Sequence, residues 1–218
     1  MKKLLMIVSG ADSLTLADGT SHPTGFWAEE VVESVRVLRE AGIEVTVATP
    51  GGVVPTVDKA SLDGKFDQAV EELADLRTPA TLAEQKASDF DAIYLPGGHG
   101  PMADLAFDRA LGSLLADFHD NDKLVAALCH GPAGLLSAVR ADGTFVFAGK
   151  EMAVFSDDEE RQGGLAVPYS VSDRLAELGA RLASGEPWSS TVVVDGRLVT
   201  GQNPQSTVAT ATQVAALL

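Results

Sequence analysis

The sequence contains a single cysteine, Cys129, among its 218 residues. One thiol cannot form an intrachain disulfide or a thiolate metal cluster, which excludes a disulfide-stapled secreted scaffold. Basic residues are also scarce, because 16 lysines and arginines oppose 31 aspartates and glutamates and give a formal net charge of −15. A chain this acidic lacks the clustered positive charge that binds nucleic acid or an anionic membrane surface, so we expect neither as a partner.

Long hydrophobic runs are absent as well. No stretch of the sequence approaches the roughly 20 apolar residues that cross a bilayer. Residues 4–8 are apolar and follow two lysines, but this run is shorter than the roughly 7–15 residues of a signal-peptide core. A buried first strand explains the run better, and the expected location is the cytoplasm.

Strand and helix patterns alternate along most of the chain. Residues 4–8 and 43–48 are typical of buried strands, and between them residues 27–41 carry apolar side chains at helical spacing. This βαβ opening predicts parallel strands joined by a right-handed crossover. Later segments continue the alternation, with strands expected at 92–95, 124–128 and 152–155, helices at 108–119, 132–139 and 172–180, a hairpin at 191–200, and a final helix after Asn203-Pro204. The sequence therefore predicts an α/β fold with a doubly wound, mainly parallel sheet covered by helices on both faces.

Residues 51–88 depart from this rhythm. The segment is polar, is interrupted by prolines and an Asp-Gly pair, and shows only a weak helical pattern. We expect an excursion or small cap on one domain spanning residues 1–218, and not a second domain.

The stretch around Cys129 has the clearest chemical pattern. The cysteine lies between an expected strand and an expected helix start, and the residues two positions either side, Ala127 and Gly131, are small. A nucleophile on a sharp strand-to-helix turn needs small neighbours at these positions. The helix N-terminus would lower the pKa of the thiol, and His130 could exchange a proton with it. The alternative is a buried structural cysteine, which is the commonest role of a lone cysteine.

Two further segments contain candidate site residues. Gly97 and Gly98 follow an expected strand, where their backbone N–H groups could form an oxyanion hole, although a tight turn alone would explain them equally well. If that strand neighbours the Cys129 strand, both loops open on the same edge of the sheet. Glu29 and Glu30 begin the first long helix, where glutamates usually just complement the helix dipole in solvent.

The positions of the histidines exclude several enzyme classes. Histidine occurs only at positions 22, 99, 119 and 130, so no histidine follows His130. A glutaminase-type triad with a late His-x-Glu pair and a papain-like arrangement are therefore impossible. The histidines and carboxylates show no metal-ligand spacing, and no nucleotide-binding motif is present. We expect neither a metal nor another cofactor.

Four motifs together resemble the ThiJ/PfpI superfamily, and they appear in its order along essentially the whole chain. The similarity is greatest to the branch of the heat-shock chaperone and glutathione-independent glyoxalase III proteins, often labelled class I glutamine amidotransferase-like. The motifs are Thr24-Gly25-Phe26-Trp27-Ala28-Glu29-Glu30, Leu95-Pro96-Gly97-Gly98-His99-Gly100, Ala127-Leu128-Cys129-His130-Gly131-Pro132 and Val199-Thr200-Gly201-Gln202-Asn203-Pro204.

The resemblance implies a flavodoxin-like three-layer fold, usually in a homodimer. It implies that Cys129 is the nucleophile, beside His130, and that Glu30 is the glutamate that touches it, which leaves Glu29 as a surface residue. The oxyanion donors would be backbone N–H groups of Gly98 and His130. An acid that orients the histidine falls at Glu160 within an acidic run, with Asp157 as the alternative in that run.

The expected activity is that of a cofactor-free, glyoxalase III-like lyase acting on small 2-oxoaldehydes such as methylglyoxal. Two other classes remain open. One is a stress-response chaperone or deglycase-type protein. As a chaperone it would require an exposed apolar patch on the dimer, and its activity would not depend on Cys129. The other is a cysteine amidase or peptidase, with which the adjacent Cys129 and His130 are compatible.

Overall fold

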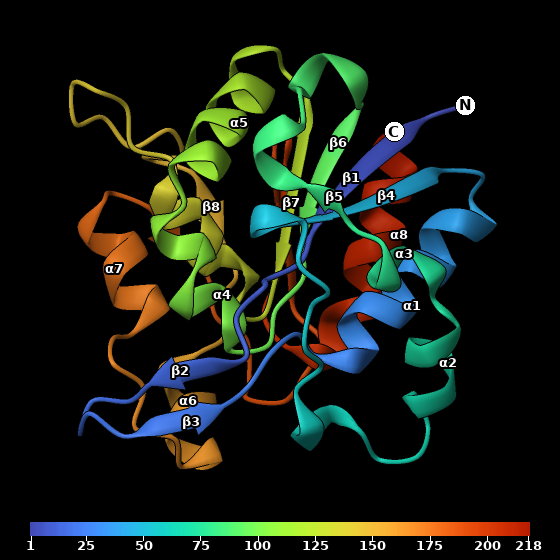
Figure 1. The fold of residues 1–218 in the computed structure, drawn as a ribbon. Coiled ribbons are helices and arrows are strands. Elements are labelled where there is room, and N and C mark those ends of the chain that lie inside the picture. Colours follow the sequence, from blue (N-terminus) through green and yellow to red (C-terminus); the bar gives the residue numbers. More distant parts are fainter.

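A seven-stranded sheet forms the centre of the computed structural model, which describes all residues 1–218 (Figure 1). Its strands in spatial order are β10 (Val192–Asp195), β11 (Leu198–Gly201), β7 (Leu124–Leu128), β6 (Ala92–Leu95), β1 (Lys3–Ile7), β4 (Glu44–Thr49) and β5 (Ala80–Thr81). Within this sheet only the β10–β11 pair is antiparallel. Two small ribbons lie outside this sheet and pair β2 (Ser13–Thr15) with β3 (Ser21–Pro23) and β8 (Glu151–Met152) with β9 (Arg181–Leu182).

Helices cover both faces of the sheet, as the sequence predicts. The helices are α1 (Ala28–Glu40), α2 (Asp67–Glu72), α3 (Ala74–Arg77), α4 (Gly100–Ala103), α5 (Arg109–Asp120), α6 (Asp157–Gly163), α7 (Val171–Glu177) and α8 (Thr207–Leu217). Side chains on β1 alternate between two buried clusters, because successive residues of a strand point to opposite faces. Leu4 and Met6 pack in the cluster that contains α1 and α8, and Leu5 and Ile7 pack in the one that contains α5 and α7. This arrangement confirms the three-layer, flavodoxin-like fold.

The strand order brings the carboxyl ends of three neighbouring strands together near the middle of the sheet. The chain runs outward from β1 to β4 and β5, then returns to β6 on the other side of β1 and continues to β7 and β11. Ligands of open α/β sheets bind beyond the carboxyl ends of the strands where the order reverses. Here Leu95 of β6 pairs with Ala127 of β7, and Leu128 pairs with Gly201 of β11. The three strands therefore end side by side, just before Gly97, Cys129 and Gln202.

Three of the local differences from expectation concern strands and the segment after Cys129. Strand β5, at the end of the polar 51–88 segment, returns to the sheet and pairs parallel with β4. Residues 131–137 form a 3₁₀ helix where an α-helix was expected at 132–139. The strand expected at 152–155 is shorter and is paired outside the main sheet as β8.

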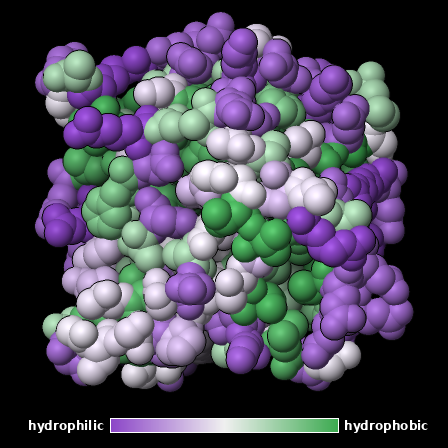
Figure 2. Space-filling view, viewed as in Figure 1, coloured by the Kyte–Doolittle hydropathy of each residue, from purple (hydrophilic) through white to green (hydrophobic).

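The helices are short or polar, and one face of the surface is mainly hydrophilic at its rim. None of the helices has both the length and the apolar character needed to cross a membrane. Figure 2 shows that hydrophilic residues form most of the rim of one face, whereas hydrophobic ones gather toward its middle.

Candidate active site

Cys129 occupies a strained turn between β7 and the 3₁₀ helix 131–137. Its φ angle is +60°, one of three positive values at non-glycine residues in the chain. Non-glycine residues adopt this left-handed conformation at an energetic cost, and such residues cluster at functional sites. A Cβ at Gly131 would lie 2.0 Å from the carbonyl oxygen of Leu95, so the turn needs a glycine at this position. The local backbone is therefore that of a nucleophile elbow.

Glu30 lies inside the protein and not on the solvent face of α1. It is fully buried, and its Oε2 accepts a 2.7 Å hydrogen bond from the backbone N–H of Gly97. Its Oε1 is buried without a hydrogen-bond partner. Burial raises the pKa of Glu30 to about 8, against the effect of the Gly97 bond and of the nearby Cys129 thiol. The carboxyl is thus mainly protonated near neutral pH, and its unpartnered oxygen is available to give a proton. Glu29, one residue earlier, is partly exposed.

The Cys129 thiol is not activated in the way that the sequence suggests. Burial raises its pKa well above the ordinary value, and the charge of Glu30 raises it further. The backbone N–H groups of His130 and Gly98 point toward the sulfur and act in the opposite direction. The prediction that a helix N-terminus lowers the pKa of this thiol is therefore wrong. The sulfur is buried next to a carboxyl group, and the helix that follows Cys129 is only a short 3₁₀ helix. A thiolate at this position requires a neutral Glu30 and a base for the thiol proton.

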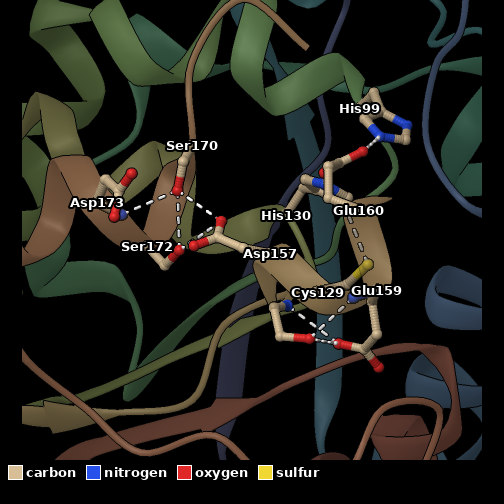
Figure 3. A network of polar contacts seen from close by, with 10 residues as sticks. His99, Cys129, His130, Asp157, Glu159, Glu160, Ser170, Ser172 and Asp173 are labelled. Atoms are coloured by element: carbon tan, nitrogen blue, oxygen red, sulfur yellow. Dashed lines mark hydrogen bonds and ion pairs between the residues drawn. The ribbon is translucent and has the colours of Figure 1, made fainter. Parts of the chain in front are cut away.

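His130 is positioned to be that base. Its Nδ1 lies 3.4 Å from Cys129 Sγ, and its Nε2 lies 2.7 Å from Oε2 of Glu160 (Figure 3). The ring is held between His99 and Phe155, with ring centroids 4.1 and 4.4 Å away. Burial, and next the proximity of His99, lower the pKa of His130 to about 4, so the ring is neutral near pH 7.

Glu160 determines which nitrogen of His130 carries the proton. Burial favours the neutral form of Glu160, but hydrogen bonds from His130 and His99 outweigh it and lower the pKa of the carboxyl to about 2. An ionised carboxylate only accepts hydrogen bonds, so Nε2 of His130 must donate. The lone pair of Nδ1 then faces the Cys129 thiol.

The acidic run forms the first turn of α6, and its members have separate contacts. Asp157 accepts hydrogen bonds from the hydroxyls of Ser170 and Ser172 at 2.7 and 3.0 Å, so it contacts the start of α7 and not His130. Glu159 is fully buried and forms a capping box with Ser156. Of the two acids considered for orienting the histidine, the structure brings Glu160 and not Asp157 to His130.

Glu159 holds three separate segments together around the site. Its Oε2 accepts hydrogen bonds from the backbone N–H and hydroxyl of Ser156 and from Gln202 Nε2, at 3.0, 2.7 and 3.1 Å. Its Oε1 accepts from Trp188 N and Asn203 Nδ2 at 2.8 and 2.7 Å. No local sequence pattern indicates this role, because the partners other than Ser156 lie far away along the chain.

The glycines after β6 are required by close packing. Gly98 has a φ angle of +87°, and a Cβ there would lie 2.3 Å from the Gly25 carbonyl oxygen. A Cβ at Gly97 would lie 2.8 Å from the backbone nitrogen of His130. This approach aims the N–H of Gly97 at Glu30 and the N–H of Gly98 toward Cys129 Sγ. An oxyanion formed at the sulfur would therefore meet the N–H groups of Gly98 and His130.

A pocket of about 270 Å³ opens over these groups. Its lining combines Cys129, His130 and Glu160 with the aromatic side chains of Trp27, Phe155 and Trp188. This volume lies at or below the lower end of the range for ligand sites, which favours a small substrate.

Most residues that line the pocket were not among the predicted site residues, and His99 and Trp188 are two of them. His99 lies in the pocket with its Nε2 3.2 Å from Oε1 of Glu160, and its place after Gly97-Gly98 was a signal for it. Trp188 has a φ angle of +59° and stacks edge-on to Phe155 at 5.6 Å, and no sequence pattern marks it. The fold also brings ligand atoms of His99, His130 and Glu160 within 4.8 Å of one another, a proximity that their spacing along the sequence does not indicate.

Comparisons with known proteins identify the family of this chain. The DJ-1/PfpI family profile matches residues 22–217. The protein/nucleic acid deglycase HchA of Pseudomonas aeruginosa is 30% identical over 223 residues, which cover 93% of this chain and 76% of that protein. The crystal structure of glyoxalase III from Candida albicans superposes with a TM-score of 0.82 at 26% identity, covering 99% and 96% of the two chains. The 24 kDa rapid encystment protein of Francisella tularensis gives a TM-score of 0.89 at 28% identity, covering 99% and 98%. The match to the family profile over most of the chain and the identity to the HchA relative show that the chain belongs to the DJ-1/PfpI family.

Proposed function

We propose that this protein is a glutathione-independent, glyoxalase III-type lyase that converts small 2-oxoaldehydes such as methylglyoxal into 2-hydroxy acids. The observation that carries the proposal is the placement of Cys129 between a buried Glu30 and the Nδ1 of His130, in a pocket of about 270 Å³. Relatives named glyoxalase III and deglycase support chemistry on aldehyde-derived compounds at such a site.

The first step forms a bond between sulfur and the aldehyde carbon. His130 Nδ1 accepts the thiol proton, while its Nε2–H stays bonded to the Glu160 carboxylate. The thiolate adds to the aldehyde carbon of the substrate and gives a hemithioacetal. The N–H groups of Gly98 and His130 stabilise the oxyanion that develops on the former aldehyde oxygen, which then takes up a proton.

The second step moves a proton between the two substrate carbons. A base removes the hydrogen of the hemithioacetal carbon, and an enediolate forms. Protonation of the neighbouring carbon then gives a 2-hydroxy thioester. Glu30 and His130 are the two groups placed for these transfers, and a pKa of Glu30 near 8 suits a group that both gives and takes a proton near neutral pH.

Water completes the reaction. It attacks the thioester carbonyl, the carbon–sulfur bond breaks, and the acid leaves with the Cys129 thiol restored. The former aldehyde carbon is oxidised to the level of an acid, and the neighbouring ketone carbon is reduced to an alcohol. Both changes occur within one substrate, so the reaction needs no external electron carrier. Methylglyoxal and water yield lactate.

The test is lactate production from methylglyoxal without glutathione. We expect the wild-type protein to form lactate and Cys129→Ala to form it only at the uncatalysed rate. Glu30→Gln should lose at least about 100-fold in kcat, as removal of a general acid–base group does. Lactate formation that is undetectable in the wild type, or equal in Cys129→Ala, would show the proposal to be wrong.

Deglycase action is the second candidate, because the HchA relatives carry that name. An adduct on a macromolecule would have to bring its glycated group to Cys129, which is only 4% exposed. The two activities separate when purified glycated protein is freed of methylglyoxal before the assay. Lyase action alone removes the adduct no faster than methylglyoxal dissociates spontaneously, whereas deglycase action makes removal depend on enzyme concentration.

A further inference from the structure

Three side chains of the types that ligate metals come from separate segments and meet at one wall of the pocket. His99 follows β6, His130 follows β7, and Glu160 lies in the first turn of α6. Figure 3 shows the two imidazoles and the carboxylate beside one another. The Nε2 atoms of His99 and His130 lie 3.2 and 2.7 Å from the two oxygens of Glu160. The Glu160 carboxylate thus contacts both imidazoles at their Nε2 atoms, which are also the atoms that would bind a metal.

We propose that His99, His130 and Glu160 form a binding site for a divalent transition-metal ion such as Zn²⁺, and that the metal-loaded protein is inactive as a lyase. The second part of this statement rests on the proposed function, whereas the first part stands without it.

The donor set and its geometry suit such an ion. Imidazole nitrogen and carboxylate oxygen bind Zn²⁺ at about 2.0–2.2 Å, and three protein ligands with one open position are common at accessible zinc sites. Tetrahedral bonds of that length place ligand atoms about 3.4 Å apart. The imidazole nitrogens lie 3.2 and 2.7 Å from the two different oxygens of Glu160, and the three ligand atoms lie within 4.8 Å of one another. Movements of about 1 Å in the side chains bring them to the tetrahedral separation, and the Glu160 side chain is 17% exposed. All three residues line the pocket, so a water molecule can occupy the fourth position.

Metal binding would reverse the hydrogen bond between His130 and Cys129. A metal on Nε2 takes the lone pair of that nitrogen, so the ring proton of neutral His130 must reside on Nδ1. Nδ1 lies 3.4 Å from Sγ and would then donate to the sulfur, and it could no longer accept the thiol proton. His99 undergoes the same exchange of tautomer. No electrons are transferred, and removal of the metal restores the base.

Cys129 with Glu30 is the competing location for a metal, because thiolates also bind Zn²⁺. Co²⁺ distinguishes the two sites, since it has the ligand preferences of Zn²⁺ and reports a bound thiolate by an intense near-ultraviolet charge-transfer band. The chain contains no other cysteine that could produce this band.

The experiment titrates Co²⁺ into the metal-free, full-length wild type and four variants, without substrate. We expect one equivalent to bind with visible bands typical of nitrogen and oxygen ligands and no thiolate band, in the wild type and in Cys129→Ala alike. His99→Ala and Glu160→Gln should weaken binding at least about tenfold. The matched control is His22→Ala, which removes a pocket histidine outside the cluster and should leave binding unchanged. Circular dichroism checks folding, and His99→Gln replaces His99→Ala if the latter is unfolded.

Activity provides the second readout. Zn²⁺ should abolish lactate formation over the concentration range in which it binds, and a chelator should restore it. A thiolate band that disappears in Cys129→Ala, or no binding to the wild type, would overturn the metal site. Binding at the cluster without inhibition would overturn the second part. Absence of lactate formation in the metal-free protein would refute the proposed function and leave the binding result intact.

Discussion

The buried Glu30 carboxyl should make the protein less stable as the pH rises, and Glu30→Gln should remove that loss. The pKa of Glu30 is about 8 in the folded protein because of burial, whereas its ordinary value is 4.5. Below about pH 4.5 the carboxyl is protonated in both the folded and the unfolded chain. Between these two values the unfolded chain releases the proton and the folded protein retains it, so the free energy of unfolding falls as pH rises through this window.

The size of the effect follows from the two pKa values. Each unit corresponds to about 1.4 kcal/mol, so the full difference gives a loss on the order of 3–5 kcal/mol by about pH 8. Glutamine has nearly the same shape, keeps an oxygen for the Gly97 N–H and never ionises. The stability advantage of Glu30→Gln over the wild type should therefore grow from near zero at about pH 4.5 to a few kcal/mol at about pH 8.

The measurement is urea unfolding of both proteins across this pH range. Cys129 also titrates beside Glu30, so the comparison is repeated in a Cys129→Ala background. Tyr94 and Glu29 also interact electrostatically with Glu30, and both are present in wild type and variant. Glu29→Gln is the control, and its effect should be much smaller because that side chain is only partly buried. If Glu30→Gln is less stable than the wild type at every pH, or if the difference does not grow with pH, the reasoning is wrong.

Three further substitutions test other parts of the site. Five donors contact the Glu159 carboxylate, and Glu159→Gln places an amide N–H₂ against at least two of them. This should lower the free energy of unfolding, measured with urea, by about 2–4 kcal/mol. An unchanged unfolding midpoint would contradict this role of Glu159. Trp188→Ala should raise kcat/KM for phenylglyoxal relative to methylglyoxal, because it opens a pocket wall, and an unchanged ratio refutes this. Gly98→Ala should abolish lactate formation, since its Cβ would lie 2.3 Å from a carbonyl oxygen and would displace the N–H that faces the sulfur. A near-wild-type kcat would contradict the close packing required at this position.

The fold follows from local patterns that one sequence contains. Continuous apolar runs such as residues 124–128 identify strands buried on both faces, and helical spacing identifies α1 and α5. The two-residue strand β5 carries no such pattern, because it is too short to show a period and depends on its pairing with β4. The 3₁₀ form of residues 131–137 likewise depends on tertiary packing, since their sequence also suits an α-helix.

The site was predictable where its residues follow strand ends. Cys129, His130, Gly97 and Gly98 lie directly after β7 or β6, so the parallel sheet brings them together. Glu30 could not be assigned from the residues alone, because an early helical glutamate usually faces solvent, and only the resemblance to a family indicated it.

Protonation and long-range contacts were not predictable. The raised pKa of the Cys129 thiol depends on complete burial beside Glu30, which no local pattern reveals. The contacts of Glu159 with Trp188 and Asn203 join residues that are 29 and 44 positions apart. Such contacts exist only once the sheet and the loops that cover it have assembled.

Covalent attachment of the substrate to Cys129 is the central claim, and mass spectrometry of an acid-quenched reaction tests it most directly. Wild-type protein mixed with excess methylglyoxal and no glutathione should carry one substrate-derived group, located by peptide mapping at Cys129, and the group should disappear as lactate accumulates. An adduct located elsewhere, or lactate formation at an undiminished rate in Cys129→Ala, would contradict the account.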